Sequence, residues 1–254
     1  MTESRAPAGL YDGEDAGTIA ARLGVPRVVA LETTTSTLDV AHALAAEGAA
    51  AGTVVLAESQ TAGRGRSGKR WTSAPGAGIW LTIIERSLDP ATLSLLALRL
   101  GIAGAVALQP FAPGPIGVKW PNDLSVGGRK LAGILVEARW RESSPEWVAI
   151  GMGVNVAAPR DVEGAIGLKE GASRLAVLAA LVPALRAAAA RPGELGDDEL
   201  SALAARDVGR GRHAISPGRG TVDGVSPSGE LLLRLPNGTL VAHRAGSLVF
   251  AEES

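Results

Sequence analysis

Cysteine is absent from the 254-residue sequence. Its absence excludes disulfide bonds and zinc sites built from thiolates, and it fits a reducing compartment. The sequence also lacks an excess of one charge. Its 25 Lys and Arg residues nearly balance its 26 Asp and Glu residues, and the formal net charge is −1. No global electrostatic field therefore favours a nucleic acid or an anionic membrane as a partner.

Long apolar runs are missing as well. Residues 1–17 contain acids and glycines where a secretory signal peptide needs an apolar core. The most apolar stretch, residues 93–108, is interrupted by Arg99 and is shorter than the ~20 residues that a membrane-spanning helix requires. We therefore expect a soluble, cytoplasmic protein that does not bind a membrane.

Aromatic residues make up only 3% of the sequence, yet five tryptophans accompany just two Phe and one Tyr. Three of these tryptophans, Trp71, Trp80 and Trp120, lie in or beside the motifs described below. The length of the chain predicts one large domain, or one domain with a small appendage.

The pattern of apolar residues and turn signals predicts three parts. Residues 1–27 are expected to form a polar N-terminal arm with a short helix at 18–23. Residues 28–206 combine helical and strand patterns, which is typical of an α+β domain with a mixed sheet and flanking helices. Within this domain we expect helices at 38–47, 89–108 and 173–191, and strands at 53–57, 79–84, 116–120, 123–126, 130–137 and 147–155.

Residues 207–254 differ from the rest of the chain in their pattern of short apolar segments and turn residues. Short apolar and β-branched segments are separated there by Pro-Gly, Ser-Gly and Asn-Gly turns. Five short strands in about fifty residues predict a small SH3-like barrel. The expected strands are 212–216, 221–225, 230–235, 239–244 and 247–251.

The densest chemical signal is the segment from Gln60 to Trp71, which contains three glycines and four cations without an acid. Gly63-x-Gly65-x-x-Gly68 matches the dinucleotide-binding fingerprint, and a P-loop is matched up to its final Ser or Thr. Both motifs require a helix directly after the loop, so that the helix N-terminus receives phosphate. A turn leading into a strand follows here, so both assignments are excluded.

A flexible basic loop between two strands remains. Its glycines let backbone amides approach a ligand closely, and its arginines, Arg64 and Arg66 among them, offer forked donors to phosphate oxygens. Taken alone, the segment is equally compatible with a solvated hairpin tip.

Three further motifs combine polar residues with predicted strand ends. In Lys119-Trp-Pro-Asn-Asp123, a carboxylate after a Pro-Asn turn is suited to Mg²⁺, although an ordinary turn gives the same pattern. Lys130 begins an otherwise apolar strand, where it is either an edge cation or an active-site charge. Asn155 ends the segment GMGVN, and its amide could contact an adenine edge.

Together, GRGRSGKRW, KWPNDL, GRKLAGILVE and GMGVN, in this order and preceded by Ser36-Thr37, resemble the signature motifs of biotin–protein ligases. The resemblance covers about residues 29–250. It implies a catalytic domain like that of class II aminoacyl-tRNA synthetases and a C-terminal SH3-like domain. It also implies that biotin is activated with ATP and Mg²⁺ to biotinyl-5′-AMP. The biotinyl group is then transferred to a lysine of a biotin carboxyl carrier protein, a domain of biotin-dependent carboxylases.

The resemblance also implies residue roles. Lys130, Arg66 and Asp123 are expected to be catalytic, with Asp123 holding the metal. The expected biotin-binding residues are Ser36, Thr37, Gln60, Gly63, Arg64, Arg66, Lys130, Gly133 and Leu135. The expected ATP- and adenylate-binding residues are Arg66, Lys69, Trp71, Trp80, Lys119, Asn122 and Asn155.

The chemistry of adenylation favours the same residue types. Attack of a carboxylate on the α-phosphorus brings two anions together, so lysine, arginine and Mg²⁺ must offset their repulsion. A ureido ring offers donors and an acceptor, which a buried Ser, Thr and Gln set would recognise. Gly133 and Leu135 would provide an apolar slot for the rest of biotin.

The sequence departs from the family pattern at two positions. Leu38 stands where the family usually has Asn, so one polar biotin contact is in doubt. Lys69 replaces an arginine and provides a point charge without the planar fork. Larger family members carry an N-terminal DNA-binding domain, for which residues 1–27 are too few, so we expect the ligase-only type that does not bind DNA.

Two alternatives are kept. A lipoate or octanoate–protein ligase shares the fold, but the KWPND and GRGR motifs favour biotin. A non-catalytic biotin or nucleotide sensor is disfavoured by the intact Lys130 and Asp123. The identity of the carrier protein is left open, and so is a homodimer formed through an exposed sheet edge.

Overall fold

The larger part of the protein is built on a seven-stranded sheet with the order β1-β2-β3-β7-β6-β5-β4. The computed structural model describes residues 9–251, so the first eight residues of the expected N-terminal arm and the last three of the expected C-terminal domain lie outside the described residues. β1 and β2 are parallel and the other neighbours are antiparallel, which confirms the predicted mixed sheet. The strands are β1 Val28–Thr34, β2 Thr53–Gln60, β3 Gly78–Glu85, β4 Ile116–Lys119, β5 Asp123–Val126, β6 Arg129–Arg141 and β7 Ser144–Asn155.

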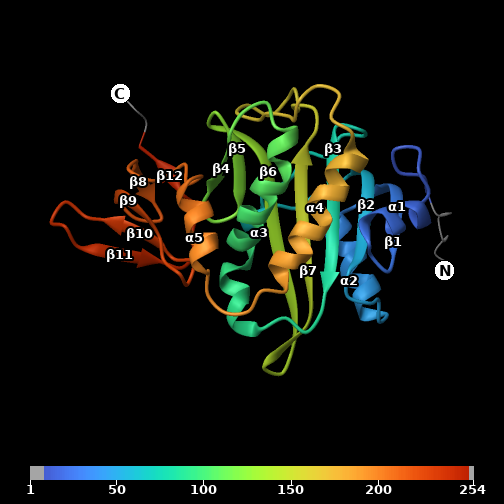
Figure 1. Cartoon of the computed structure of the whole chain (residues 1–254), viewed down its shortest axis with the longest axis horizontal. Coiled ribbons are helices and arrows are strands. Elements are labelled where there is room, and N and C mark those ends of the chain that lie inside the picture. Colours follow the sequence, from blue (N-terminus) through green and yellow to red (C-terminus); the bar gives the residue numbers. More distant parts are fainter. Residues whose placement is uncertain (1–8, 252–254) are drawn as a thin grey trace.

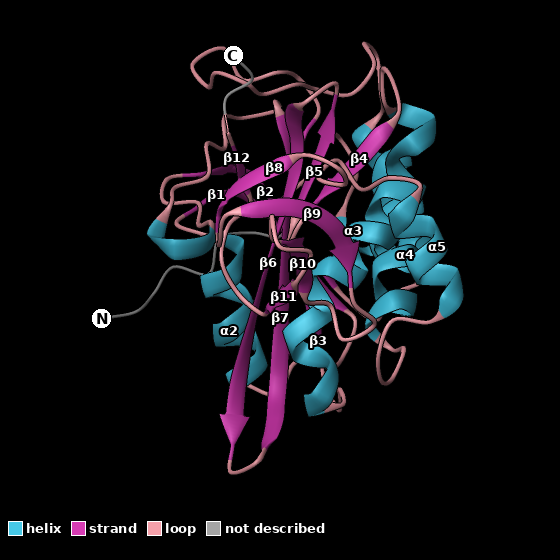
Figure 2. Cartoon of the chain, turned by 90° about the vertical axis from the view of Figure 1, so that its left-hand side faces the viewer, coloured by secondary structure: helices cyan, strands magenta, loops and turns pink. Residues whose placement is uncertain are grey.

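Helices cover the two faces of this sheet unequally. The long apolar helices α3 and α4 lie against one face, and the shorter α2 lies against the other, as Figures 1 and 2 show. The helices are α1 Ala16–Leu23, α2 Thr37–Ala46, α3 Leu93–Leu108, α4 Arg174–Ala189 and α5 Asp197–Ala204, with 3₁₀ turns at Arg66–Gly68, Pro90–Thr92 and Gln109–Phe111. Because α2 is only ten residues long, part of its face of the sheet stays open for a ligand.

The segment Pro90–Phe111 is long and apolar enough, at a mean hydropathy of 1.9, to cross a membrane by length and composition alone. In this fold it packs against α4 and the sheet, and 61% of its most apolar 18-residue stretch is buried. Arg99, which interrupts the apolar sequence, is itself 1% exposed. A buried core helix therefore accounts for the hydropathy of the segment.

β6 and β7 form a hairpin that extends past the neighbouring strands (Figure 2). These strands are longer than the expected 130–137 and 147–155. Beyond Glu137 they pair mainly with each other, and polar side chains such as Arg141 and Glu146 line that part. The sequence pattern did not predict this extension, because a two-stranded ribbon exposed to water needs no apolar alternation.

Residues 9–27 differ from the polar arm expected for the beginning of the chain. Tyr11 and Ile19 are fully buried and Leu23 is 4% exposed, all within the main core. Arg174 of α4 stacks on Tyr11 at 4.5 Å and lies 2.8 Å from an oxygen of Asp12. The short helix expected at 18–23 is confirmed as α1, and its buried face packs on β1 and α4, so the segment belongs to the core instead of forming a polar arm.

The C-terminal part contains the expected five strands, paired as an antiparallel sheet with the order β11-β10-β9-β8-β12. They are β8 His213–Ser216, β9 Gly220–Val225, β10 Leu231–Arg234, β11 Leu240–His243 and β12 Val249–Phe250. Closure of this sheet into an SH3-like barrel stays a prediction.

The connection between the two sheets is itself hydrogen-bonded. The Val118 amide of β4 donates to the Arg206 carbonyl at 2.8 Å, and the Val208 amide donates back to the Val118 carbonyl at 3.2 Å. The proposed boundary at residues 206–207 therefore falls on a segment that continues the large sheet beside β4. Leu231 and Leu233 of β10 join the same core cluster, so the small sheet packs directly on the large domain.

The helix α5 was not predicted, although three acids in its first turn are a recognised start signal. Its position depends on Arg99 of α3, whose Nε lies 2.8 Å from an oxygen of Glu199. The same guanidinium donates to the carbonyls of Arg191, Gly193 and Glu194. One buried cation therefore satisfies three carbonyls of the turn that connects α4 to α5.

We expect Arg99→Met to lower the free energy of unfolding by about 3–5 kcal/mol, because it removes the buried cationic partner of Glu199 and the donor to three carbonyls. Urea unfolding followed by circular dichroism measures the change. Arg141→Met is the control, since its partner Glu146 meets it on the exposed hairpin and the expected loss is below ~1 kcal/mol. Equal losses in the two variants would contradict the structural role of Arg99.

Candidate functional site

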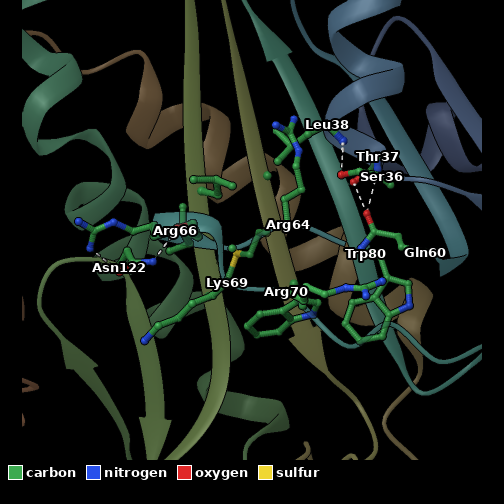
Figure 3. A pocket seen from close by; sticks show the side chains of 18 of the residues that line it. Ser36, Thr37, Leu38, Gln60, Arg64, Arg66, Lys69, Arg70, Trp80 and Asn122 are labelled. Atoms are coloured by element: carbon green, nitrogen blue, oxygen red, sulfur yellow. Dashed lines mark hydrogen bonds between the residues drawn. The ribbon is translucent and has the colours of Figure 1, made fainter. Parts of the chain in front are cut away.

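A pocket lies on the open face of the large sheet, between the first turn of α2, the strands β3, β6 and β7, and the loop 63–71 (Figure 3). It brings together most of the residues that the motifs indicated. The predicted site residues that line it are Ser36, Thr37, Gln60, Arg64, Arg66, Lys69, Trp71, Trp80, Asn122, Asp123, Lys130, Gly133 and Leu135. Leu38, Gly65, Arg70, Leu81, Ile134, Gly151, Met152, Gly153 and Ser247 line it in addition.

Uncharged hydrogen-bonding groups occupy one end of the pocket (Figure 3). The Gln60 Oε1 accepts from both the backbone amide and the hydroxyl of Thr37, and the Thr37 hydroxyl accepts from Thr82. Ser36 caps α2 by accepting from the Leu38 amide, and Gln60 Nε2 donates to Ser73. Thr37 is thus committed to protein contacts. The Ser36 hydroxyl hydrogen and the second Gln60 amide hydrogen can still donate to a ligand.

Leu38 is buried beside this polar end and packs onto Gly151 of β7. A Cβ at Gly151 would lie 3.1–3.2 Å from three carbons of the Leu38 side chain. Leu38, which departs from the family pattern, therefore fills the space above Gly151 and makes this wall of the pocket apolar.

Trp71 covers the middle of the pocket floor. Gly133 and Gly153 are direct partners in the β6–β7 pairing. A Cβ at Gly153 would lie 2.5 Å from the Trp71 indole, and one at Gly133 would lie 3.0 Å from it. The indole thus rests on a pair of glycines in the middle of the sheet, and it meets Trp80 of β3 edge to face at 6.4 Å.

Arg66 and Lys69 lie with Asn122 at the opposite end (Figure 3), and Lys130 and Asp123 line the pocket beside them. The Lys130 ammonium lies 2.8 Å from Asp123 Oδ1 and 5.1 Å from the centre of the Trp71 ring. Arg66 donates to Asn122 Oδ1 at 3.0 Å and to the Gly246 carbonyl of the C-terminal part at 3.1 Å. The loop, the large sheet and the small sheet therefore meet at this end.

Three predicted site residues do not line the pocket. Gly63 has a structural role, since a Cβ there would lie 2.5 Å from the Trp71 carbonyl. Asn155 is buried, and its side chain donates to the Lys130 carbonyl at 3.2 Å, so it supports the strand that carries Lys130. Lys119 lies 5.4 Å from the Phe250 ring.

Lys119 stands near other positive charges. Burial lowers its pKa, and Lys130, Arg212 and Lys69 lower it further, while Asp123 opposes them. Arg212 lies just before β8, and its guanidinium stacks at 3.6 Å on the same Phe250 ring that Lys119 approaches. No motif pointed to Arg212, because this residue lies far along the chain from all of them. A concentration of cations is suited to a polyphosphate.

The described residues contain no cluster of three or more His, Asp and Glu side chains that could enclose a metal ion by themselves. Asp123 is the carboxylate at the cationic end of the pocket, with its side chain 27% exposed. Mg²⁺ commonly binds one or two carboxylates together with substrate phosphates and water. The donor set therefore fits a magnesium ion that arrives with a nucleotide.

Residues 30–155 match the model of the biotin/lipoate A/B protein ligase family. The chain is 40% identical over 128 residues to the bifunctional ligase/repressor BirA of Bacillus spizizenii, a match that covers 48% of this chain and 38% of the relative. It is 39% identical over 118 residues to the biotin–[acetyl-CoA-carboxylase] ligase of Mycobacterium tuberculosis, covering 44% and 42%. These matches thus span less than half of each relative's length.

The fold is similar over a larger part of the chain to a solved structure. The biotin protein ligase of Aquifex aeolicus in complex with biotin and ATP aligns with a TM-score of 0.70, covering 88% of this chain and 99% of that one, at 23% identity. This similarity confirms the predicted α+β fold, including the C-terminal β-sheet region.

We expect Gly153→Ala to destabilise the protein by about 1–3 kcal/mol and to displace Trp71, because the new methyl group would overlap the indole. Urea unfolding and a red shift of the tryptophan emission measure the two effects.

Gly101→Ala is the matched control. Its Cβ would meet only ordinary contacts at 3.7–3.9 Å inside α3, and we expect it to stabilise the helix by about 0.5–1 kcal/mol. An unshifted emission spectrum in Gly153→Ala would show that Trp71 does not depend on the glycine pair.

Proposed function

Because residues 30–155 match the model of the biotin/lipoate A/B protein ligase family, we propose that the chain is a biotin–protein ligase. It activates biotin with ATP to biotinyl-5′-AMP and transfers the biotinyl group to a lysine of a biotin carboxyl carrier protein. One observation carries the proposal. A single pocket joins an uncharged hydrogen-bonding end to a cationic end, as a substrate with a neutral ring and a reacting carboxylate requires.

The uncharged end suits the ureido ring of biotin. The Ser36 hydroxyl and the Gln60 amide both have hydrogens to donate, and the ureido carbonyl is an acceptor. Leu38, Leu135 and the glycine floor provide an apolar surface for the thiophane ring and the valerate chain. A ligand without the ureido group would leave buried donors unpaired, which is costly.

The cationic end suits adenylation. A carboxylate oxygen of biotin bonds to the α-phosphorus of ATP, the bond to the β-phosphate oxygen breaks, and pyrophosphate leaves. Negative charge gathers on the phosphoryl oxygens as the two anions meet. Lys130 and Arg66, held by Asp123 and Asn122, offset this charge without having to reorganise.

A bound Mg²⁺ would neutralise phosphate charge and orient the polyphosphate. Asp123 is the residue that would hold it, with water and phosphate oxygens completing the coordination. Because the same carboxylate pairs with Lys130, its charge serves both cations.

Transfer needs the carrier lysine as a neutral amine. Its nitrogen attacks the acyl carbon of biotinyl-5′-AMP, the bond from that carbon to the phosphate oxygen breaks, and AMP leaves while the amine loses a proton. The basic loop, whose arginines line the pocket, would keep water from the labile adenylate until the amine arrives.

The proposal is tested by incubating the protein with ATP, Mg²⁺ and biotin and measuring pyrophosphate, followed by mass spectrometry of an added carrier domain. Pyrophosphate release with biotin and a mass increase of the carrier are the expected results. Release that needs octanoate or lipoate instead would identify a lipoate-type ligase. Binding of biotin or ATP without any pyrophosphate would identify a sensor.

We expect Lys130→Met to slow formation of biotinyl-5′-AMP by about 100-fold to 1000-fold, because it removes a cation placed where two anions meet and keeps the side-chain length. Pyrophosphate release in a single turnover measures the effect. Lys169→Met is the control, because Lys169 contacts the Pro110 carbonyl away from the pocket. Adenylation at the wild-type rate would remove Lys130 from the mechanism.

We expect Asp123→Asn to raise the magnesium concentration needed for half-maximal activity by at least about tenfold, because the change removes a charged ligand and keeps its shape. Activity is titrated with magnesium, and calorimetry with biotin alone serves as the control. A large loss of biotin affinity with an unchanged magnesium response would assign Asp123 to biotin binding.

A further inference from the structure

Arg64, the first arginine of the basic loop, contacts carboxylates of the protein. Its Nη2 lies 3.0 Å from Asp39 Oδ1 and 2.9 Å from Glu137 Oε2. Figure 3 shows the side chain extending away from Arg66 and Lys69 at the cationic end. Two carboxylates therefore hold the guanidinium that the loop motif would otherwise offer to a ligand.

Glu137 is held in turn by a chain of hydrogen bonds from the core. His42 Nε2 lies 2.9 Å from the same Glu137 Oε2, and Trp147 Nε1 lies 2.9 Å from His42 Nδ1. An indole nitrogen can only donate, so His42 Nδ1 is the acceptor and the ring hydrogen is on Nε2, where it donates to Glu137. Since Trp147 is 8% exposed, the chain is anchored in the interior.

Asp39 connects the same arginine to the substrate-binding turn of α2. It lies in the first turn of the helix that Ser36 caps, and its other oxygen accepts from the Thr35 hydroxyl at 3.3 Å. Arg64 thus ties the loop to the element that carries Ser36 and Thr37, while Glu137 ties it to β6, the strand of Lys130. These contacts connect the loop to α2 at the uncharged end of the pocket and to the part of β6 beyond it.

We propose that Asp39, Glu137 and His42 are positioning residues that hold the loop 63–71 over the pocket through Arg64. The proposal rests on the proposed ligase function. The side chains of Arg64, Asp39 and Glu137 are 38%, 48% and 30% exposed, and ion pairs of this exposure are individually weak. Such contacts hold a lid in place yet let it open for biotin and for the carrier lysine.

Steady-state kinetics with Glu137→Gln and Asp39→Asn test the proposal. We expect the KM for biotin to rise about fivefold in each variant, because each loses one ion pair with Arg64 and a single exposed ion pair is weak. The kcat should change less than twofold, since bound ligand holds the loop and Lys130 and Asp123 stay on their strands. Glu146→Gln is the matched control. It removes a carboxylate from the same hairpin, where its partner is Arg141, and should keep wild-type values.

Limited trypsin digestion gives a readout that does not depend on activity. Cleavage after Arg64, followed by mass spectrometry of the fragments, should be about fivefold faster in Glu137→Gln and Asp39→Asn than in Glu146→Gln. His42→Ala should also accelerate this cleavage, because it leaves Glu137 without its donor from the core. Thermal unfolding of each variant shows whether the fold is retained.

The outcomes separate the two proposals. Unchanged cleavage after Arg64 together with an unchanged KM for biotin would overturn the positioning role. If Glu137→Gln does not fold, Asp39→Asn decides the question, because Asp39 is nearly half exposed. A wild-type protein that releases no pyrophosphate from ATP and biotin would refute the proposed ligase, and the cleavage rates would still decide whether the carboxylates hold the loop.

Discussion

The missing side chains of Gly133 and Gly153 are the constraint on which the pocket depends. The antiparallel pairing of β6 with β7 places the two glycines opposite each other in the middle of the sheet. Their flat backbone lets the Trp71 indole lie against the strands. Trp71 then contacts Lys130 and Trp80, and its backbone carbonyl restricts Gly63 at the start of the loop. The covering loop is therefore positioned from the floor of the pocket as well as from its rim.

The two ends of the pocket are organised by opposite physical means. At the uncharged end, Thr37 and Gln60 satisfy each other, so few hydrogen-bonding groups remain and those are donors. At the cationic end, single carboxyl or amide oxygens restrain Lys130 and Arg66 without neutralising the whole group of charges. In the proposed ligase, the first arrangement would select a ligand by shape and hydrogen bonding, and the second would stabilise charge that develops during adenylation.

The sequence was sufficient to predict what local patterns determine. The turn before Ile79, the Asp89-Pro90 helix start and the paired strands around Gly127 and Gly128 predicted the elements that the structure contains. The four motifs, compared with a family, predicted most of the pocket lining. Features that depend on register or on distant contacts were not predicted. Glu137 was visible only as the end of an apolar motif, and its contact with Arg64 requires two segments that are 73 residues apart. The burial of Tyr11 likewise depends on Arg174, which no pattern near Tyr11 reveals.

The departure at Leu38 is understandable from the same geometry. The side chain is buried against Gly151, where its branched end fills the space above a residue without a side chain. An amide at this position would need partners, and the neighbouring Thr37 and Gln60 already pair with each other. Leucine avoids this cost and adds apolar contact to the wall. In the proposed ligase, recognition of the ligand ring would then rest on the Ser36 hydroxyl and the remaining Gln60 hydrogen. With fewer polar contacts, the selectivity of the proposed ligase would depend more strongly on how closely the loop covers the pocket. The carboxylates that hold Arg64 would keep the loop close over the pocket, and this closeness would compensate for the polar contact that Leu38 does not make.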